Sequence, residues 1–271
     1  MSEITLRRGI KLIISLVYFG LTSGMRLAGL TQRRLTILYY HGVPAELRRN
    51  FARQMDALER AAHVVPASFR GKLPTGGKFV AITFDDAFQT VADYAIPELA
   101  ARSFHSTIFV PVGLIGRRPN WAMKDGYQIS EQVMSMEQLK QIVSPLVELG
   151  SHTNTHPVIC ELDDKHRREE IDGCLHSLQE LTGQVIRLFS FPYGRYDAAS
   201  VEVCRAAGYE FVFSILAREV DTMSPEFVRG RVKVDPSDGP LEFFLKFNGA
   251  YEWTAYLHSF RRRDARLRAR S

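Results

Sequence analysis

The sequence predicts an α/β fold in which about seven parallel strands, with helices between them, close into a single (β/α) barrel. Strand-like and helix-like segments alternate six or seven times along the chain, which is the pattern of parallel strands joined by right-handed helical crossovers. A length of 271 residues suits one such barrel, and no internal repeat or long linker divides the chain. Apolar residues make up 45% of the chain, which is enough to fill a core and argues against intrinsic disorder.

Three strands and three helices are predicted in the first half of the chain. Pro97 fits the first turn of its helix, where a missing N–H costs nothing. Ser135 and Gln138 have the spacing of a capping box at the start of another helix. In order, the elements are strand 36–41, helix 50–62, strand 78–86, helix 96–103, strand 105–111 and helix 135–149, the last with a kink or an early end at Pro145.

The second half continues the alternation. Gly183 and Gly208 each follow a helical segment at the position where a left-handed residue commonly ends a helix. The elements are helix 163–183, strand 185–194 running into a turn, helix 197–208, strands 209–215 and 227–234, and a helical segment from about residue 240. The segment 115–129 breaks this rhythm, and we expect it to form a loop at one mouth of the barrel, where binding residues often lie.

These elements divide the chain into three parts. Residues 1–34 form a basic and apolar N-terminal segment, residues 35–239 form the barrel, and residues 240–271 form a C-terminal helix with a basic tail. Residues 1–34 and 260–271 each carry a net charge of +5, as does the whole chain, so the remainder is net acidic. Nucleic-acid binding by the barrel therefore gains no support, whereas the basic ends suit an anionic membrane face.

The N-terminal segment contains an uncharged run of 14 residues, from Leu12 to Met25. A membrane-spanning helix needs about 20 apolar residues, and no A-x-A-like cleavage site follows the basic start. Three interpretations stay open: a helix lying on the membrane surface, a short anchor, or a helix packed on the barrel. Since the three cysteines are scattered and suit a reducing compartment, we expect a cytoplasmic protein or one peripheral on the cytoplasmic membrane face; an exported, tethered protein is the alternative.

Polar residues that can hold a metal ion follow two of the predicted apolar runs. Asp85 and Asp86 come directly after VAITF, and His152 and His156 lie four residues apart in SHTNTHP. Because the carboxyl ends of parallel strands in a barrel converge on one face, these groups can share one site. Two imidazoles and one carboxylate are a common ligand set for a catalytic divalent metal, and a second carboxylate is then free to act as a base. The third ligand is therefore predicted to be one of the paired aspartates.

These motifs also carry a family resemblance. TFDD (83–86), HTNTH (152–156) and FPYG (191–194), in this order, resemble the successive motifs of the polysaccharide deacetylase family, also called the NodB-homology or carbohydrate esterase family 4 group. The resemblance extends from about Thr36 to Val234. It implies a distorted (β/α) barrel that removes N-acetyl groups from sugars with one bound divalent metal ion, usually zinc.

The resemblance assigns roles to particular residues. It implies that Asp85 is the general base and that the backbone N–H of Tyr193 helps to bind the oxyanion. The metal ligands that it implies are Asp86, His152 and His156. Pro192 and Tyr193 of the third motif, His41 at the end of a strand that resembles the first strand of bacterial members, and Trp121 of the 115–129 loop are expected to contact the substrate. Trp121 would stack on a sugar ring, or would pack the loop onto the barrel.

The sequence departs from the family pattern in three places. Many members have an arginine two residues before the proline of the third motif, where it orients the catalytic aspartate, and here that position is Ser190. Arg229 and Arg231 are candidates to replace it from a later strand. Asp221 is a candidate for the late acidic motif. The late Leu-x-His motif, which supplies the general acid, has no clean counterpart, although YLHS contains His258.

We therefore predict a metal-dependent hydrolase that removes N-acetyl groups from an N-acetylated sugar in a polysaccharide or glycolipid intermediate. One alternative is a catalytically impaired NodB-like protein that binds saccharide or assists glycan assembly, because Ser190 and the missing acid motif weaken the catalytic assignment. Another is a glycosidase that uses Asp85 and a distant carboxylate about 5–9.5 Å away. The histidine pair would then have no role, which argues against a glycosidase.

Overall fold

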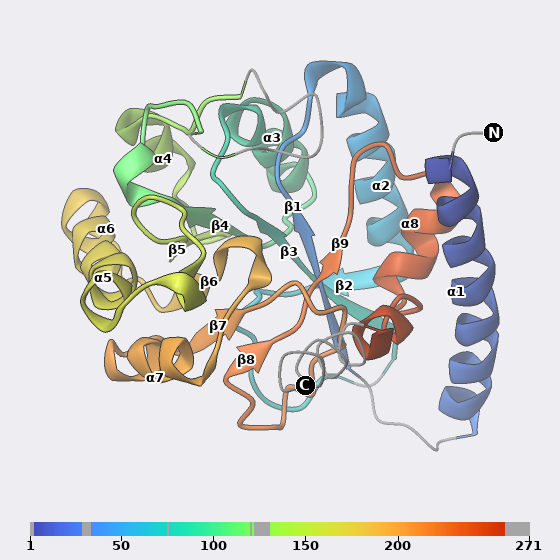
Figure 1. The fold of residues 1–271 in the computed structure, drawn as a ribbon. Helices are drawn as coiled ribbons and strands as arrows, with labels where there is room; N and C mark the ends of the chain where they lie inside the picture. Colours follow the sequence, from blue (N-terminus) through green and yellow to red (C-terminus); the bar gives the residue numbers. More distant parts are fainter. Residues whose placement is uncertain (1–2, 29–33, 75, 120, 122–130, 258–271) are drawn as a thin grey trace.

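A computed structural model describes residues 3–28, 34–74, 76–119, 121 and 131–257 of the chain. It contains a curled sheet of nine strands in the order β8-β7-β6-β5-β4-β3-β1-β9, with β2 also paired to β3 (Figure 1). The strands are β1 (Leu35–Tyr40), β2 (Ala62–Val64), β3 (Lys78–Phe84), β4 (Ser106–Val110), β5 (Val147–Ser151), β6 (Leu188–Ser190), β7 (Phe211–Phe213), β8 (Val228–Arg229) and β9 (Val232–Lys233). Every pairing between these strands is parallel, which confirms the predicted distorted (β/α) barrel.

The two ends of the sheet are joined by a single short bend in the chain. β8 pairs with β7 and β9 pairs with β1, yet only Gly230 and Arg231 separate β8 from β9. A side chain at position 230 would place its Cβ 2.5 Å from the carbonyl oxygen of Leu216, so only glycine allows this close approach. The segment predicted as one strand, 227–234, is therefore two short strands that close the barrel.

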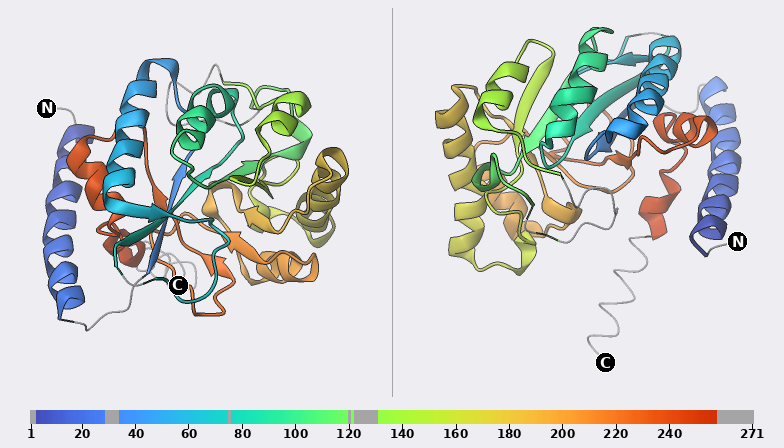
Figure 2. Two further views of the ribbon diagram at one scale, coloured as in Figure 1. Left: turned by 180° about the vertical axis from the view of Figure 1, so that it is seen from behind. Right: turned by 90° about the horizontal axis from the view of Figure 1, so that it is seen from above.

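Helices cover the outer face of the curled sheet (Figures 1 and 2). They are α2 (Arg48–Ala61), α3 (Ile96–Ala100), α4 (Met136–Ile142), α5 (Asp164–Arg168), α6 (Cys174–Thr182), α7 (Ala198–Ala206) and α8 (Pro240–Phe247), while α1 (Glu3–Leu27) lies outside α8. The main core lies between sheet and helices, where Ile82 of β3 belongs to the same buried cluster as Phe51 of α2. A second, smaller cluster includes Ile37, Ala81 and Phe213, which fill the barrel interior.

The alternation of side chains along β3 decides which residues enter the barrel. Val80 and Ile82 belong to the outer core, whereas Phe79 and Ala81 belong to the inner cluster. Since successive side chains on a strand point to opposite faces, Thr83 continues the inner row and Asp85 follows it just past the end of the strand. The sheet itself therefore directs Asp85 toward the interior at the carboxyl end of the barrel.

Two predicted helices differ from the observed ones around their prolines. The helix predicted over 135–149 ends at Ile142, and the apolar residues from Val147 form β5, because Pro145 cannot continue a helix and a short apolar run fits a buried strand equally well. Pro97 lies in the first turn of α3, as predicted, but the helical segment already begins at Gln89 and passes through a π-helical turn, Val91–Ala95, before α3. A π turn of this kind accommodates a proline that lacks an N–H.

Several local predictions are confirmed. Ser135 accepts a hydrogen bond from the backbone of Gln138, whose side chain accepts one in return, which completes the capping box of α4. Gly183 ends α6 in the left-handed conformation, with φ of 68°. β2 was not predicted, because its three residues continue the apolar pattern of α2. The sheet and its helices thus follow the predicted alternation, with boundaries set by proline and glycine.

The N-terminal segment forms the long helix α1 at one side of the molecule, against α8 (Figures 1 and 2). Arg8 donates to Glu242 of α8 across 2.6 Å, and the ring of Phe19 meets that of Phe244 edge to face at 5.3 Å. Of the three interpretations of this segment, the one in which the helix packs on the rest of the protein is thus observed. A helix long and apolar enough to cross a bilayer is absent from the part of the chain that the structure describes.

Candidate metal centre

The predicted site residues meet at the carboxyl edge of the sheet. Asp85 and Asp86 follow β3, His152 follows β5, and the turn Pro192–Gly194 follows β6. β3, β4, β5 and β6 are neighbours in the parallel sheet. The loops that leave these strands therefore project from one edge and bring together residues more than 100 positions apart in the chain.

Asp86, His152 and His156 form the cluster expected of a metal centre. Each offers one ligand atom, and these three atoms lie within 4.8 Å of one another. The Nε2 atoms of His152 and His156 lie 3.5 and 3.4 Å from Oδ1 of Asp86. This Oδ1 is buried and accepts no hydrogen bond from the described residues. A buried carboxylate oxygen without a donor, facing two imidazole nitrogens, fits a divalent cation of the zinc type.

The surroundings of the two histidines set the orientation and the pKa of each ring. Nδ1 of His152 lies 2.7 Å from the carbonyl oxygen of Ser190, so Nδ1–H donates there and Nε2 faces Asp86. Burial lowers the pKa of His156 to about 3, which keeps this ring neutral. Burial also opposes protonation of His152, but Asp86 and Asp85 raise its pKa on balance. A cation at the site would displace that proton.

The backbone is held in an unusual conformation at these ligands. Asp86 has φ of 70°, Thr153 of 66°, His156 of 61° and Tyr193 of 57°, all in the left-handed region that non-glycine residues seldom adopt. Hydrogen bonds pin the HTNTH loop in this shape: the N–H of His156 donates to Oγ1 of Thr153 across 3.0 Å. Left-handed residues of this kind concentrate at binding and catalytic sites, where the surrounding structure compensates for their strain.

Asp85 is clamped by a guanidinium that enters from the closing bend of the barrel. Nη1 and Nη2 of Arg231 donate to the two carboxylate oxygens of Asp85 across 2.7 and 2.9 Å. Nη2 also donates to Oγ of Ser190 across 2.7 Å, and Nη1 to Oγ1 of Thr83 across 3.2 Å. Burial would raise the pKa of Asp85, but the charges of Arg231 and His152 lower it to about 2. Asp85 is therefore an ionised, fixed carboxylate beside the three candidate metal ligands.

Arg231, and not Arg229, thus takes the place predicted for a base-orienting arginine. Arg229 is also buried, but its guanidinium donates to the carbonyl oxygens of Ala67 and Phe69 and stacks on the ring of Phe211 at 3.3 Å. A single strand would put residues 229 and 231 on the same face. The bend at Gly230 separates them, so that only Arg231 reaches Asp85.

Aromatic side chains surround His156. The indole of Trp121 stacks on its imidazole with ring centroids 3.9 Å apart and an angle of 20°. The ring of Tyr193, which is 42% exposed, approaches the same imidazole edge-on at 4.8 Å. Trp121 therefore orients a candidate ligand with one face of its ring, a contact that the sequence could not reveal.

The remaining predicted site residues fall into three groups. His41 lies at the end of β1, close enough to lower the pKa values of Asp85 and Asp86 by its charge, and Pro192 is buried in the third-motif turn. Asp221 is not at the site: it follows Val220, which bridges to the first residue of β1 at the opposite edge of the sheet. His258 lies outside the described residues.

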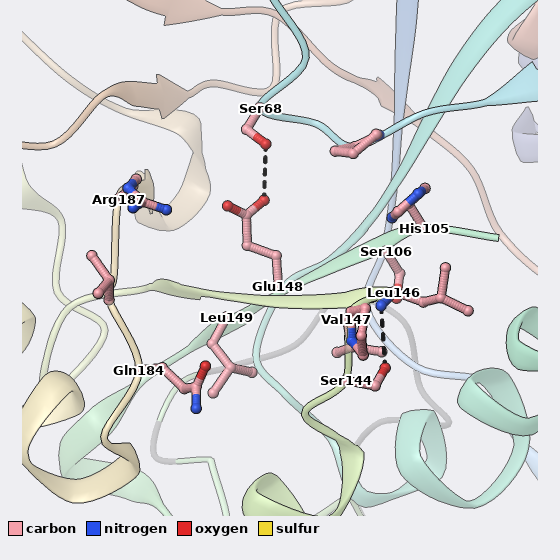
Figure 3. A pocket seen from close by; sticks show the side chains of 13 residues that line it. Ser68, His105, Ser106, Ser144, Leu146, Val147, Glu148, Leu149, Gln184 and Arg187 are labelled. Atoms are coloured by element: carbon pink, nitrogen blue, oxygen red, sulfur yellow. Dashed lines mark hydrogen bonds between the residues drawn. The ribbon is translucent and has the colours of Figure 1, made fainter. Parts of the chain in front are cut away.

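The cavity shown in Figure 3 is separate from this centre. It has a volume of about 430 Å³ and lies where β4 and β5 begin, at the edge of the sheet opposite the metal ligands. Glu148 points into it and accepts a hydrogen bond from Ser68 across 3.2 Å. None of the predicted site residues lines this cavity.

Known proteins are similar to this chain both in sequence and in fold. A family model described as polysaccharide deacetylase matches residues 72–212, which include all three motifs. The chain is similar to the Bacillus subtilis (strain 168) protein YxkH, whose name assigns it to the polysaccharide deacetylases, with 23% identity over 159 residues. This match covers 59% of the chain and 52% of YxkH, about half the length of that relative.

Solved structures resemble the chain over most of its length. IcaB from Ammonifex degensii is 28% identical, with a TM-score of 0.64 over 82% of this chain and 98% of that one. The Streptococcus pyogenes deacetylase PplD, solved in complex with acetate, is 16% identical, with a TM-score of 0.67 over 80% of this chain and 99% of that one. At its lower identity, the second likeness supports the fold alone.

Proposed function

Because the chain belongs to the polysaccharide deacetylase family, we propose that it is a metal-dependent hydrolase that removes N-acetyl groups from a polysaccharide or glycolipid intermediate. The observation that carries the proposal is a cluster of three candidate metal ligands next to a carboxylate that an arginine holds in place. Asp86, His152 and His156 offer three ligand atoms within 4.8 Å of one another. Asp85, the adjacent carboxylate, is held instead by Arg231 and so stays available for proton transfer.

The metal-binding unit would hold one divalent ion, with Zn²⁺ favoured by its carboxylate and imidazole ligands. Such an ion, when bound, supplies Lewis acidity that polarises an amide carbonyl and makes a nearby water more acidic. The chain contributes the orientation of the ligands: Ser190 fixes the ring of His152 through its carbonyl oxygen, and Trp121 stacks on His156. Both contacts hold ligand nitrogens toward Asp86.

Asp85 is proposed as the general base. It accepts a proton from the water that attacks the acetyl carbonyl, and the two hydrogen bonds from Arg231 hold its carboxylate in place. The N–H of Tyr193 is proposed to donate to the oxygen that becomes negatively charged. The left-handed conformation of Tyr193 belongs to the turn that presents this N–H.

His41 is proposed as the group that protonates the leaving amine. It follows β1 next to Asp85, because Tyr40 of β1 is paired with Phe84 of β3 and the backbone N–H of Asp85 donates to the carbonyl oxygen of Tyr40 across 2.9 Å. It belongs to no metal-ligand cluster among the described residues. The exposed ring of Tyr193 offers an apolar surface for a sugar ring at the same edge. The products would be acetate and a free amino sugar.

The alternative of a catalytically impaired saccharide-binding protein loses its main support. Ser190 weakened the catalytic assignment because the family arginine is absent from that position. Arg231 approaches from the closing bend of the barrel and donates to both Asp85 and Ser190 Oγ. The smaller serine side chain thus leaves room for the guanidinium of Arg231, which is proposed to orient Asp85 from another strand.

The direct test is release of acetate by the purified chain, loaded with Zn²⁺, from a panel of N-acetylated oligosaccharides and glycolipids. We expect release from at least one substrate, and a loss of roughly 10²–10⁴-fold in kcat in His41→Ala with metal content unchanged. His176→Ala, an exposed histidine on α6, is the matched control and should keep full activity. Saccharide binding without acetate release by the wild-type chain would support the impaired protein instead.

For the cellular location, we propose that the substrate is handled on the cytoplasmic side of the membrane. The support is the basic N-terminal segment and the free thiols of Cys160, Cys174 and Cys204. Fusion of a reporter that is active only outside the cytoplasm to the C-terminus should give no signal. A strong signal would place the protein outside and would leave the deacetylase proposal intact.

A further inference from the structure

Helix α1 turns a continuous apolar face to solvent. Leu6, Ile10, Ile13, Ile14, Val17 and Leu21 recur at intervals of three and four residues, so they share one side of the helix. Ile13 and Leu21 are each 66% exposed and Val17 is 59% exposed. Soluble proteins normally expose single apolar side chains and not a continuous row of this length. The row therefore indicates a surface that contacts a membrane or another protein.

The opposite side of α1 is fixed to the rest of the protein. Nε1 of Trp253 donates to Oγ of Ser15 across 2.9 Å, and Tyr18 donates to Glu252 across 3.2 Å. Arg8 meets Glu242 at 2.6 Å near the start of the helix. These contacts are spread along the helix and set its rotation about its own axis. The apolar row therefore stays outward and cannot turn into the core.

The charges near this face indicate whether a membrane or a protein covers it. No charged residue occurs between Leu12 and Met25, while Arg7 and Lys11 lie on exposed positions at the N-terminal end of the helix. Residues 1–34 carry a net charge of +5. Apolar side chains next to basic ones match an anionic bilayer surface, where alkyl chains lie beneath negatively charged headgroups. As α1 does not qualify as a membrane span, it would lie in the plane of that surface.

We propose that the apolar face of α1 inserts into the interfacial layer of an anionic membrane and holds the barrel against it. The orientation of the barrel follows from the contacts of α1. Its N-terminal end reaches the loop after β9 and the start of α8, where Arg8 bonds to the carbonyl oxygen of Ser237 and to Glu242. Its C-terminal end precedes β1 in the chain. α1 thus runs alongside the strands, from the metal-site edge to the opposite edge. On the membrane the strands lie along the surface, and the site edge opens beside the lipid headgroups.

A second copy of the chain is the competing occupant of this face. A Cβ atom added at Gly20 or Gly24 would meet no other atom within 4 Å, so the surface of α1 is open there and two such helices could approach closely. The lipid surface is favoured because the basic end of α1 complements anionic headgroups, whereas a parallel pair of helices would bring the same positive charges together. The experiment separates these two occupants.

Sedimentation of the full-length chain with vesicles tests the proposal. Vesicles of 70% phosphatidylcholine and 30% phosphatidylglycerol should bind the wild-type chain, and vesicles of phosphatidylcholine alone should bind it less. The triple variant Ile13→Gln, Val17→Gln and Leu21→Gln should lower the partition coefficient on the anionic vesicles at least 10-fold. The matched control is the double variant Val185→Gln and Met223→Gln, which alters side chains that are 64% and 66% exposed elsewhere on the surface; it should bind like the wild type.

Two results would overturn the proposal. One is equal binding by the triple variant and the wild type, or no vesicle binding by either. The other is a wild-type dimer in solution that the triple variant converts to monomers while vesicle binding stays absent, which would assign the face to a second copy. If the Tm of both variants equals that of the wild type, the substitutions act at the surface and leave the fold intact. The readout does not depend on catalysis, so it is independent of the deacetylase proposal.

Discussion

Asp85→Asn is expected to abolish turnover while leaving one metal ion bound. Asparagine keeps the size of the side chain but cannot accept a proton from water, so we expect kcat to fall by roughly 10²–10⁴-fold, the contribution typical of a general base. The ligand set of Asp86, His152 and His156 does not include Asp85. Metal content, measured on the purified variant by elemental analysis, should therefore match that of the wild type.

Asp221→Asn is the matched control for this variant, because Asp221 lies near the opposite edge of the sheet. It should keep both metal and activity. If Asp85→Asn loses the metal and Asp86→Asn keeps it, the roles of the two aspartates are reversed. Unfolding must be followed in parallel, since removing one member of a buried ion pair costs about 3–5 kcal/mol of unfolding free energy.

Arg231 is expected to affect turnover through its contact with the carboxylate of Asp85. Arg231→Lys keeps a positive charge but loses the two-pronged contact with Asp85, so we expect a lower kcat with little change in KM and with metal retained. A purely structural role would instead lower stability and leave the kcat of the folded fraction unchanged. A lower kcat in a variant of unchanged stability would therefore identify Arg231 as a positioning residue.

The sequence predicted the parts of this site that follow from strand order. Asp85, Asp86 and His152 each come directly after a strand, and parallel strands deliver such residues to one edge whatever the lengths of the helices between them. The barrel was predictable for the same reason, because the alternation of strands and helices leaves few other topologies. The family resemblance then assigned the metal-ligand role to Asp86 and the general-base role to Asp85, an assignment that stays a prediction.

The parts that sequence could not predict depend on single bends of the backbone. Arg229 and Arg231 are equivalent in an unbroken strand, and only the close approach of Gly230 to the carbonyl oxygen of Leu216 sends one of them to Asp85. The left-handed conformations of Asp86 and His156 run against the ordinary preference of these residues. They are imposed by the surrounding loops, so no local pattern in the sequence signals them.

Trp121 illustrates a third limit. It was predicted to stack on a sugar ring or to pack its loop onto the barrel, and it packs on the barrel, against the imidazole of His156. The 115–129 loop contains no periodic pattern that fixes where its aromatic residues lie. Its position over a candidate metal ligand is a tertiary contact between segments distant in the chain, which no local pattern specifies.

The second large effect is expected from His152→Ala, which should remove most of the bound metal. His152 supplies one of three ligand atoms, and its ring is held by the carbonyl oxygen of Ser190. Loss of a neighbour that merely orients a ligand typically weakens metal affinity 10–100-fold, so loss of the ligand itself should weaken it by more than about 100-fold. Titration with Zn²⁺ in the presence of a competing chelator measures this affinity directly.

Thermal unfolding gives an independent measure of the same site. Zn²⁺ at about 100 times its Kd should stabilise the wild-type chain by about 2.7 kcal/mol, which raises Tm by roughly 5–10 °C. His152→Ala should lose this increase, whereas His176→Ala, which alters an exposed histidine on α6, should keep it. Because the comparison is made within each variant with and without Zn²⁺, any destabilisation by the substitution itself cancels. A full complement of metal in His152→Ala, with an unchanged response of Tm to Zn²⁺, would show that the ion binds elsewhere and would refute the proposed centre.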